Sequence, residues 1–199
     1  MGYDIELTGK NKRKAEKLLY NITKLLNKHH ITYSLEGGTL LGLYRENRIL
    51  PWDNDVDLSV IHSDAQNMDA FLNDVQKHKY RLRCKYFTKD DFVFKKGDLR
   101  IVKIRENHFF GLIKGKVCLE IFMKYSDNEN VYWRVSDKIM AAPKTIYEAY
   151  KSLTFLGHNY SIPEKTDDYL TLKYGDWKTP VKEWDAAKNE KTIIRSKNS

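Results

Sequence analysis

Cysteine is scarce in this chain: only Cys84 and Cys118 occur among its 199 residues. Neither belongs to a CxxC motif or to a cysteine and histidine spacing typical of zinc sites, so the sequence indicates neither a disulfide framework nor a structural zinc site. Cys118 falls within an apolar segment, where we expect a small core residue rather than a reactive thiol.

Long hydrophobic runs, internal repeats and low-complexity segments are also missing. No apolar stretch approaches the ~18 residues that cross a membrane, and the N-terminus lacks the apolar core of a signal peptide. Glu6 stands where an N-myristoylation motif requires Ser or Thr. We therefore expect a cytoplasmic protein without a transmembrane segment.

The composition is that of a folded protein. A hydrophobic content of 41% and an aromatic content of 13% exclude a disordered chain, and 199 residues suffice for one domain with its own core. There are 35 Lys and Arg against 27 Asp and Glu, a net charge of +8. This charge suits anionic partners such as nucleotides, phosphorylated glycans, nucleic acid or a membrane surface, and does not choose among them.

Residues 10–29 carry apolar side chains at helical spacing and predict an N-terminal helix within residues 1–30. The opposite face of this helix is basic. We expect a solvated face, although a basic helix also suits a membrane or nucleic acid. Its basic residues are Lys10, Lys12, Arg13, Lys14, Lys17, Lys24 and Lys28.

Three carboxylates alternate along the chain, at Asp53, Asp55 and Asp57, and enter an apolar segment over residues 56–61. In a strand, alternate side chains share a face, so Asp55 and Asp57 are predicted to point the same way while the apolar residues point into the core. A solvated turn after Pro51 would explain the acids equally simply. The apolar strand that follows favours an organised binding site over a solvated turn.

Upstream, residues 31–36 predict a first strand that leads into the tight turn at Gly37 and Gly38. Residues 39–46 then predict a helix. A helix N-terminus beside paired carboxylates can hold phosphate next to a divalent cation. This arrangement is the outline of a metal-dependent phosphoryl or nucleotidyl transferase.

A second apolar strand is predicted over residues 116–124, with Glu120 on the face opposite to its apolar side chains. An isolated strand Glu is commonly solvent-facing, but a transferase site of this kind needs a further acid from a neighbouring strand. Clustered carboxylates resist ionisation unless a cation neutralises them, which predicts Mg²⁺ or Mn²⁺ rather than a metal held by histidines.

These patterns predict the residues of the site. The expected metal ligands are Asp53, Asp55, Asp57 and Glu120, of which Asp55, Asp57 and Glu120 are the catalytic candidates. The expected phosphate-binding residues are Gly37, Gly38, Thr39, Arg45 and Arg48; Arg48 is equally well explained as a surface residue.

The motifs resemble those of the LicD/fukutin family. The run Gly38-Thr39-Leu40-Leu41-Gly42, then Arg45, then residues 51–57 (PWDNDVD) is similar to the family signature GTLLG…R…PWDDDID. Residues 119–122 (LEIF) and 169–180 (YL…YGDW…P) resemble two later family motifs. The chain differs at Asn54, where the family often has an acid, and at Glu120, where Asp is more usual, so the geometry at Glu120 is open.

The resemblance implies a nucleotidyltransferase-like α/β (α+β) fold, with a mixed sheet flanked by helices and a small C-terminal extension. It also implies an enzyme that transfers a phosphorylated alcohol, such as phosphocholine or ribitol phosphate, from a CDP-linked donor to a sugar hydroxyl. The implied partners are therefore a nucleotide-diphosphate-linked donor and a glycan acceptor.

Two other functions remain open. One is a nucleotidyltransferase that uses an NTP and acts on RNA, protein or a small molecule, although nucleic acid is not favoured because no basic segment is interleaved with aromatic residues. The other is a nucleotide-binding module that has lost catalysis, against which all the motif carboxylates are present.

We expect a single domain over residues 1–199. It divides into the N-terminal helix (1–30), a catalytic core (31–124), a C-terminal extension (125–184) and a loosely held polar tail (185–199). Within it, Ser63 and Gln66 predict a capping box that opens a helix, and residues 92–94 and 99–105 predict a hairpin.

Overall fold

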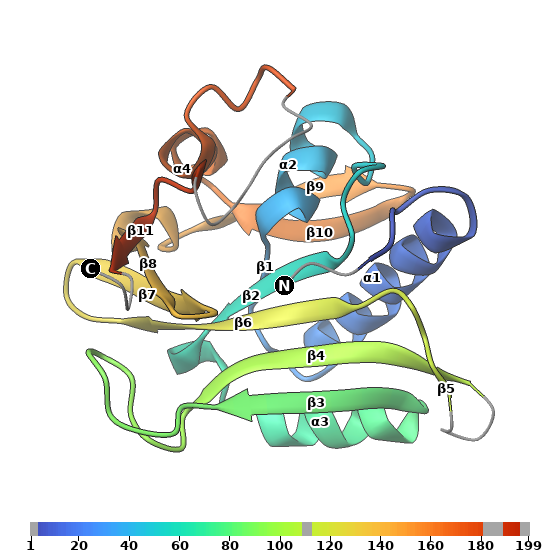
Figure 1. The fold of residues 1–199 in the computed structure, drawn as a ribbon, viewed down its shortest axis with the longest axis horizontal. Helices are drawn as coiled ribbons and strands as arrows, with labels where there is room; N and C mark the ends of the chain where they lie inside the picture. The colour runs from blue at the N-terminus through green and yellow to red at the C-terminus, as the bar shows by residue number, and fades with distance from the viewer. Residues whose placement is uncertain (1–3, 109–112, 181–188, 196–199) are drawn as a thin grey trace.

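The computed structural model describes residues 4–108, 113–180 and 189–195. Within these residues, four α-helices cover or flank a mixed sheet (Figure 1). The helices are α1 (Gly9–Lys28), α2 (Gly37–Glu46), α3 (Met68–Lys77) and α4 (Thr166–Tyr174). The strands are β1 (Ser34–Leu35), β2 (Val56–Ile61), β3 (Tyr80–Tyr86), β4 (Leu99–His108), β5 (Ile113–Lys114), β6 (Leu119–Ser126), β7 (Asn130–Val135), β8 (Lys138–Pro143), β9 (Tyr150–Phe155), β10 (His158–Pro163) and β11 (Ile193–Arg195).

Strand β6 is the centre of the sheet, since it pairs with β2, β4 and β7. The pairing of β2 with β6 is parallel, and the other pairings of the sheet are antiparallel. From β7 the sheet continues through β8 to β11, and from β4 it continues to β3. Strands β9 and β10 form a separate hairpin. The predicted mixed sheet flanked by helices is confirmed.

Helices α1 and α3 are neighbours and pack on the sheet through β6 and β3, while α2 packs on β2 (Figure 1). Val56, Leu58 and Val60 of β2 are buried, as the alternation predicted. No helix in the described ranges is long and apolar enough to span a membrane.

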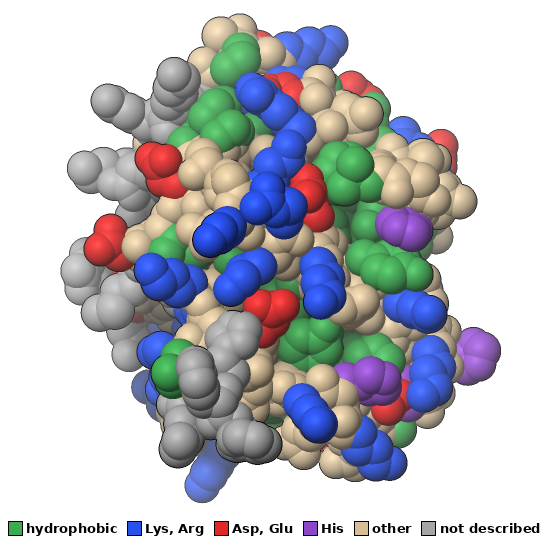
Figure 2. Space-filling view, turned by 90° about the vertical axis from the view of Figure 1, so that its right-hand side faces the viewer, with side chains coloured by type: hydrophobic (Ala, Val, Ile, Leu, Met, Phe, Trp, Pro, Cys, Tyr) green, Lys and Arg blue, Asp and Glu red, His purple; other side chains and the backbone are tan. Residues whose placement is uncertain are grey.

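The basic face of α1 is partly balanced by acids. Lys28 pairs with Asp74 of α3 at 2.7 Å, and Lys12 lies 3.8 Å from Glu16 on the same helix. Figure 2 shows the side of the molecule to which α1 contributes, and its Lys and Arg side chains are interspersed with acidic and hydrophobic ones. Exposed pairs of this kind contribute little to stability, so the face is adequately explained as solvated.

Three local expectations were wrong. No capping box forms, because residues 62–64 make a 3₁₀ turn and α3 begins only at Met68 after Asn67. The expected 92–105 hairpin is absent from the described chain; β4 pairs instead with β3, which brings Arg83 opposite Lys103. The expected strand over residues 31–36 is reduced to Ser34–Leu35.

The tail is also better held than expected. Within residues 185–199 the structure describes 189–195, and Ile193–Arg195 add a strand, β11, to the edge of β8. Glu190 and Thr192 are buried, and Lys173 of α4 pairs with Glu190 at 2.8 Å. Backbone pairing and a buried ion pair therefore fix a segment whose polar composition had indicated little order.

A buried ion network ties the helices to the sheet. Glu36 follows β1 and caps α2 by accepting a hydrogen bond from Gly37 N. Its carboxylate pairs with Lys124 of β6 at 2.5 Å and with Lys173 of α4 at 3.3 Å. The Tyr169 hydroxyl of α4 also donates to Glu36. These groups are at most 7% exposed, so each charge is stabilised by its partners rather than by water.

The pKa values of the network follow from its composition. Burial alone would raise the pKa of Glu36, but the charges of Lys124 and Lys173 and the hydrogen bonds from Lys124 and Tyr169 outweigh it and lower that pKa to about 2. Burial lowers the pKa of Lys124 to about 8, because it has less compensating charge than Glu36. The carboxylate is therefore the firmly ionised member of the pair.

We expect Lys124→Met to reduce the free energy of unfolding by about 3 kcal/mol or more, because it removes one partner of a buried pair and leaves the negative charge of Glu36 only partly neutralised. Urea unfolding followed by circular dichroism measures this loss. Lys165→Met, at an exposed position, is the control and should stay within about 0.5 kcal/mol of the parent protein. A Lys124→Met variant as stable as the control would show that the network does not hold the fold.

Candidate active site

The N-terminus of α2 lies directly against the carboxylates of the β2 segment. A Cβ built on Gly37 would lie 2.6 Å from Asp57 Oδ2, and one on Gly38 would lie 2.1 Å from Asp53 Oδ2. Gly37 also has φ +56°, a left-handed conformation that other residues adopt at a cost. The glycine pair is therefore required by the close approach of the backbone to two acidic side chains.

Thr39 anchors this arrangement. Its Oγ1 accepts a hydrogen bond from Asp57 N at 2.9 Å, and the residue is only 2% exposed. Glu36 N also donates to Asp57 O at 3.0 Å. Thr39 thus fixes β2 to the first turn of α2; its direct contact with phosphate stays a prediction.

The two arginines lie at the other end of α2, about 12 Å along the helix axis from Gly37 at ~1.5 Å per residue. Arg45 donates to Trp177 O at 2.8 Å and pairs with Glu46 at 2.5 Å, and its side chain is 9% exposed. Arg48 also pairs with Glu46 at 2.5 Å but is half exposed. The structure therefore does not bring Arg45 and Arg48 to the carboxylates, and their contact with phosphate stays a prediction.

Glu120 joins the acidic site from the neighbouring strand. It stands opposite Asp57 in the parallel β2–β6 pair, so the two side chains share one face of the sheet, and Glu120 is only 6% exposed. Lys103 of β4 stands opposite Glu120 on its other side and donates a hydrogen bond to it. Sequence analysis did not identify Lys103, because the register that places it there depends on the β4–β6 pairing.

The carboxylates interact strongly. Burial raises the pKa of Asp53 to about 6. Burial, then the negative charges of Asp53 and Glu120, raise the pKa of Asp55 to about 8. The pKa of Asp57 is raised well above its ordinary value, again first by burial and then by Asp55 and Asp53. The four predicted metal ligands thus form one electrostatic cluster.

The cluster fits an oxygen-seeking divalent cation. Asp57 Oδ1 is buried and accepts no hydrogen bond in the described residues, which is costly for a carboxylate oxygen without a ligand. The donor set consists of carboxylates alone, which Mg²⁺ and Mn²⁺ prefer. Over the described ranges, no three His, Cys, Asp or Glu side chains are already arranged around one point as a metal shell. Binding would therefore draw these side chains together.

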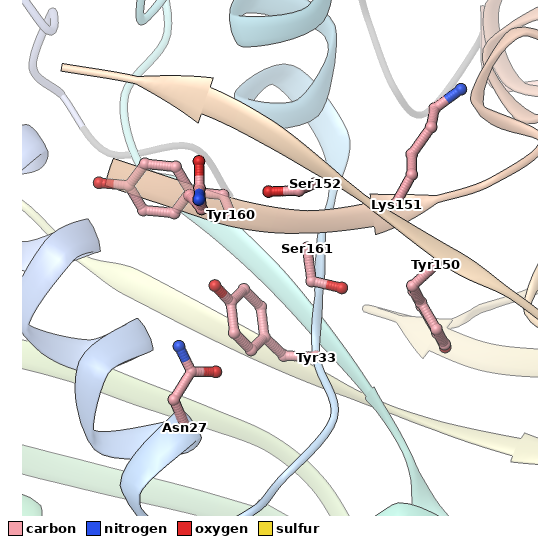
Figure 3. Close-up of a pocket in the computed structure, with 8 residues that line it drawn as sticks. Asn27, Tyr33, Tyr150, Lys151, Ser152, Tyr160 and Ser161 are labelled. Carbon is pink, nitrogen blue, oxygen red and sulfur yellow. The ribbon is translucent and has the colours of Figure 1, made fainter. Parts of the chain in front are cut away.

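A hollow lies between the C-terminal part of α1 and the β9–β10 hairpin (Figure 3). Its volume is about 270 Å³. The lining residues are polar or aromatic: Asn27, Tyr33, Tyr150, Lys151, Ser152, Asn159, Tyr160 and Ser161. Sequence analysis did not identify it, because three separate segments build it.

The C-terminal motif, residues 169–180, supports the same site through hydrogen bonds. Tyr169 donates to Glu36, the residue that caps α2, and Trp177 O receives Arg45. Trp177 Nε1 donates to Thr171 Oγ1 at 3.2 Å within the α4 segment. These contacts are structural, and they hold α4 against α2.

The comparisons with known proteins agree with this site. The family model "LicD/FKTN/FKRP, nucleotidyltransferase domain" matches residues 30–165. That range includes the acidic site and most of the sheet. The chain belongs to the LicD/FKTN/FKRP nucleotidyltransferase domain family.

Curated relatives carry transferase names. The chain is 30% identical over 179 residues to ribitol-5-phosphate transferase FKTN of Macaca fascicularis, a match that covers 87% of this chain and 35% of that protein. It is 34% identical over 55 residues to lipopolysaccharide cholinephosphotransferase LicD of Haemophilus influenzae, covering 27% of this chain and 21% of that protein. The chain thus spans about a third of the length of its fukutin relatives.

One solved structure is also similar: the crystal structure of ANT(2")-Ia in complex with adenylyl-2"-tobramycin. It is 13% identical in sequence, with a TM-score of 0.44, and the match covers 86% of this chain and 81% of that chain.

We expect Mn²⁺ or Mg²⁺ to stabilise the protein, and more strongly at pH 8 than at pH 5.5. The folded pKa of Asp55 (about 8) exceeds its ordinary 3.8, so the folded state binds more protons between these values, and the metal-free protein loses stability as the pH rises through them. A cation present at 100 times its Kd adds about 2.7 kcal/mol. Thermal melts with metal or EDTA at both pH values should show a rise in Tm of about 5–10 °C at pH 8.

Two variants test whether the metal-induced shift in Tm depends on the carboxylates. Asp55→Asn should abolish most of the metal-induced shift, whereas Asp69→Asn, an exposed position on α3, should leave it intact. Equal shifts at both pH values, or a full shift in Asp55→Asn, would contradict a metal site at these carboxylates.

Proposed function

We propose that this chain is the catalytic domain of a metal-dependent transferase that moves a phosphorylated alcohol from a nucleotide-diphosphate-linked donor to a hydroxyl group of a glycan. The observation that carries the proposal is the cluster of four carboxylates, contributed by β2, by the segment that leads into it and by the adjacent strand β6, set against the glycine-initiated N-terminus of α2. The names of the relatives, ribitol-5-phosphate transferase and cholinephosphotransferase, support the same class of reaction.

The residues supply positioning and charge. Phosphoryl transfer needs in-line placement of the attacking hydroxyl and neutralisation of charge more than covalent chemistry. A divalent cation, when bound by Asp53, Asp55, Asp57 and Glu120, would neutralise the donor phosphates and these acids. The backbone N–H groups of Gly38 and Thr39, in the first turn of α2, can hold phosphate oxygens beside them.

A carboxylate of the cluster would take the proton of the attacking hydroxyl. Glu120 is the candidate because its strand places it beside Asp57, at the edge that faces Lys103. Lys103 donates to Glu120, which orients the carboxylate. A general base must lie within hydrogen-bond reach of the hydroxyl in the complex with both substrates.

A nucleotidyltransferase that uses an NTP is the second candidate, supported by the description of the matching family model as a nucleotidyltransferase domain. The same carboxylates would serve it. The two reactions differ in their products: transfer from a CDP-linked alcohol releases CMP, whereas nucleotidyl transfer from an NTP releases pyrophosphate.

We expect ³¹P NMR of the protein with Mg²⁺ and a panel of CDP-alcohols, sugar nucleotides and NTPs to show slow CMP release from one CDP-alcohol. Asp57→Asn should lower this rate by at least about 100-fold, the usual scale for loss of a charge-stabilising catalytic group, with an unchanged circular dichroism spectrum. Asp69→Asn is the matched control and should retain the parental rate. A fully active Asp57→Asn enzyme would refute the assignment, and pyrophosphate release from an NTP would establish the second candidate.

A further inference from the structure

The strand register continues the acidic site into a row of opposite charge. Asp57 of β2 stands opposite Glu120 of β6, Glu120 opposite Lys103 of β4, and Lys103 opposite Arg83 of β3. Residues opposite one another in a sheet share a face, so all four side chains project from the same side. At ~4.8 Å per strand, Arg83 lies about 14 Å from Asp57.

Other cations share this side of β3 and β4, because side chains alternate along each strand. We call the set the β3–β4 basic face; it comprises Arg81, Arg83, Lys85, Lys103 and Arg105. On the opposite side of β3, Leu82 and Cys84 pack against the hydrophobic core, where α3 contacts the strand (Figure 1). The basic face is thus the side of these strands that α3 leaves open.

The basic face is exposed to solvent in part, and one of its side chains is held in place by a hydrogen bond. Arg81 and Arg83 are exposed, and no carboxylate in the described ranges pairs with either of them. Arg105 donates to Gly115 O at 2.9 Å, which fixes its guanidinium beside the residue that follows β5. An incoming anion would therefore meet one guanidinium that is already oriented, that of Arg105, and two exposed ones that can turn toward it, those of Arg81 and Arg83.

The cations are close enough to repel one another. Burial, then the charges of Lys103 and Arg83, lower the pKa of Lys85, and Glu120 is the acid that opposes this shift. One carboxylate thus faces several cations, and the repulsion costs free energy of folding. An anionic ligand would relieve this repulsion.

We propose that the β3–β4 basic face is a phosphate subsite, which binds a phosphate or diphosphate group of a substrate next to the acidic site. Arginine presents a planar fork that matches phosphate oxygens, and lysine adds a point charge. The open side of the sheet is thereby divided into a cation-binding half on β2 and β6 and an anion-binding half on β4 and β3.

As a subsite of the transfer reaction this inference rests on the proposed function, but its binding test does not require turnover. Two sources supply a phosphate of this chemistry: the diphosphate of the donor and an anionic group on the acceptor. Both present the same oxygens to the same side chains.

The test is isothermal titration calorimetry of the full chain with CDP, with glucose 6-phosphate and with neutral glucose, at low and moderate salt. The variant is Arg83→Gln/Lys85→Gln, which leaves the carboxylates and Lys103 in place. The matched control is Arg13→Gln/Lys17→Gln, which removes the same charge from exposed positions on α1.

We expect the β3 variant to weaken binding of at least one phosphorylated probe by about tenfold or more and to reduce its salt dependence, while the α1 variant retains parental affinity. Weakened CDP binding alone assigns the donor, and weakened glucose 6-phosphate binding alone assigns the acceptor. Parental affinity of the β3 variant for both phosphorylated probes, or an equal loss in the α1 variant, would overturn the proposal.

The two proposals fail separately. CMP release that is unchanged in Arg83→Gln/Lys85→Gln, together with parental binding of both phosphorylated probes, would leave the transferase in place and remove the subsite. Selective loss of phosphate binding in this variant, with no turnover of any CDP-alcohol by the parent protein, would keep the subsite and remove the proposed reaction.

Discussion

The buried carboxylate of Glu36 is the interaction on which the rest of this structure depends. It follows β1, caps α2, and pairs with Lys124 from the central strand and with Lys173 and Tyr169 from α4. One charge therefore joins the β1–α2 segment to β6 and α4, which are far from it in the sequence. Removing any single partner would leave the others in a medium that solvates them poorly, which makes the arrangement specific as well as stabilising.

That anchored turn makes the acidic site possible. Because α2 begins with Gly37 and Gly38 directly after the capped residue, its backbone approaches Asp53 and Asp57 more closely than any side chain would permit. The price is repulsion among carboxylates whose pKa values are raised, Asp55 to about 8. Buried carboxylates with strongly raised pKa values are typical of catalytic centres.

The charge on this face of the sheet changes from negative to positive across four strands. Acids lie on β2 and β6, and cations lie on β4 and β3, with the Lys103–Glu120 pair at the boundary. Such juxtaposition suits a substrate that carries negative charge next to a group that must be activated. The family relationship accounts for the acidic half through its motifs; the basic half follows from strand pairing in this chain.

The sequence by itself determined the features that depend on neighbouring residues. The period of Val56–Ile61 predicted a half-buried strand with carboxylates on one side, the glycine pair predicted the tight start of α2, and Glu120 was found from the alternation of its strand. Only the tertiary structure decided which strands pair. It placed Lys103 beside Glu120 and Arg83 beside Lys103, buried Lys124 against Glu36, held Arg45 at Trp177, and ordered β11. Local periodicity tells which face a side chain occupies, whereas its neighbours depend on long-range register, which no local pattern encodes.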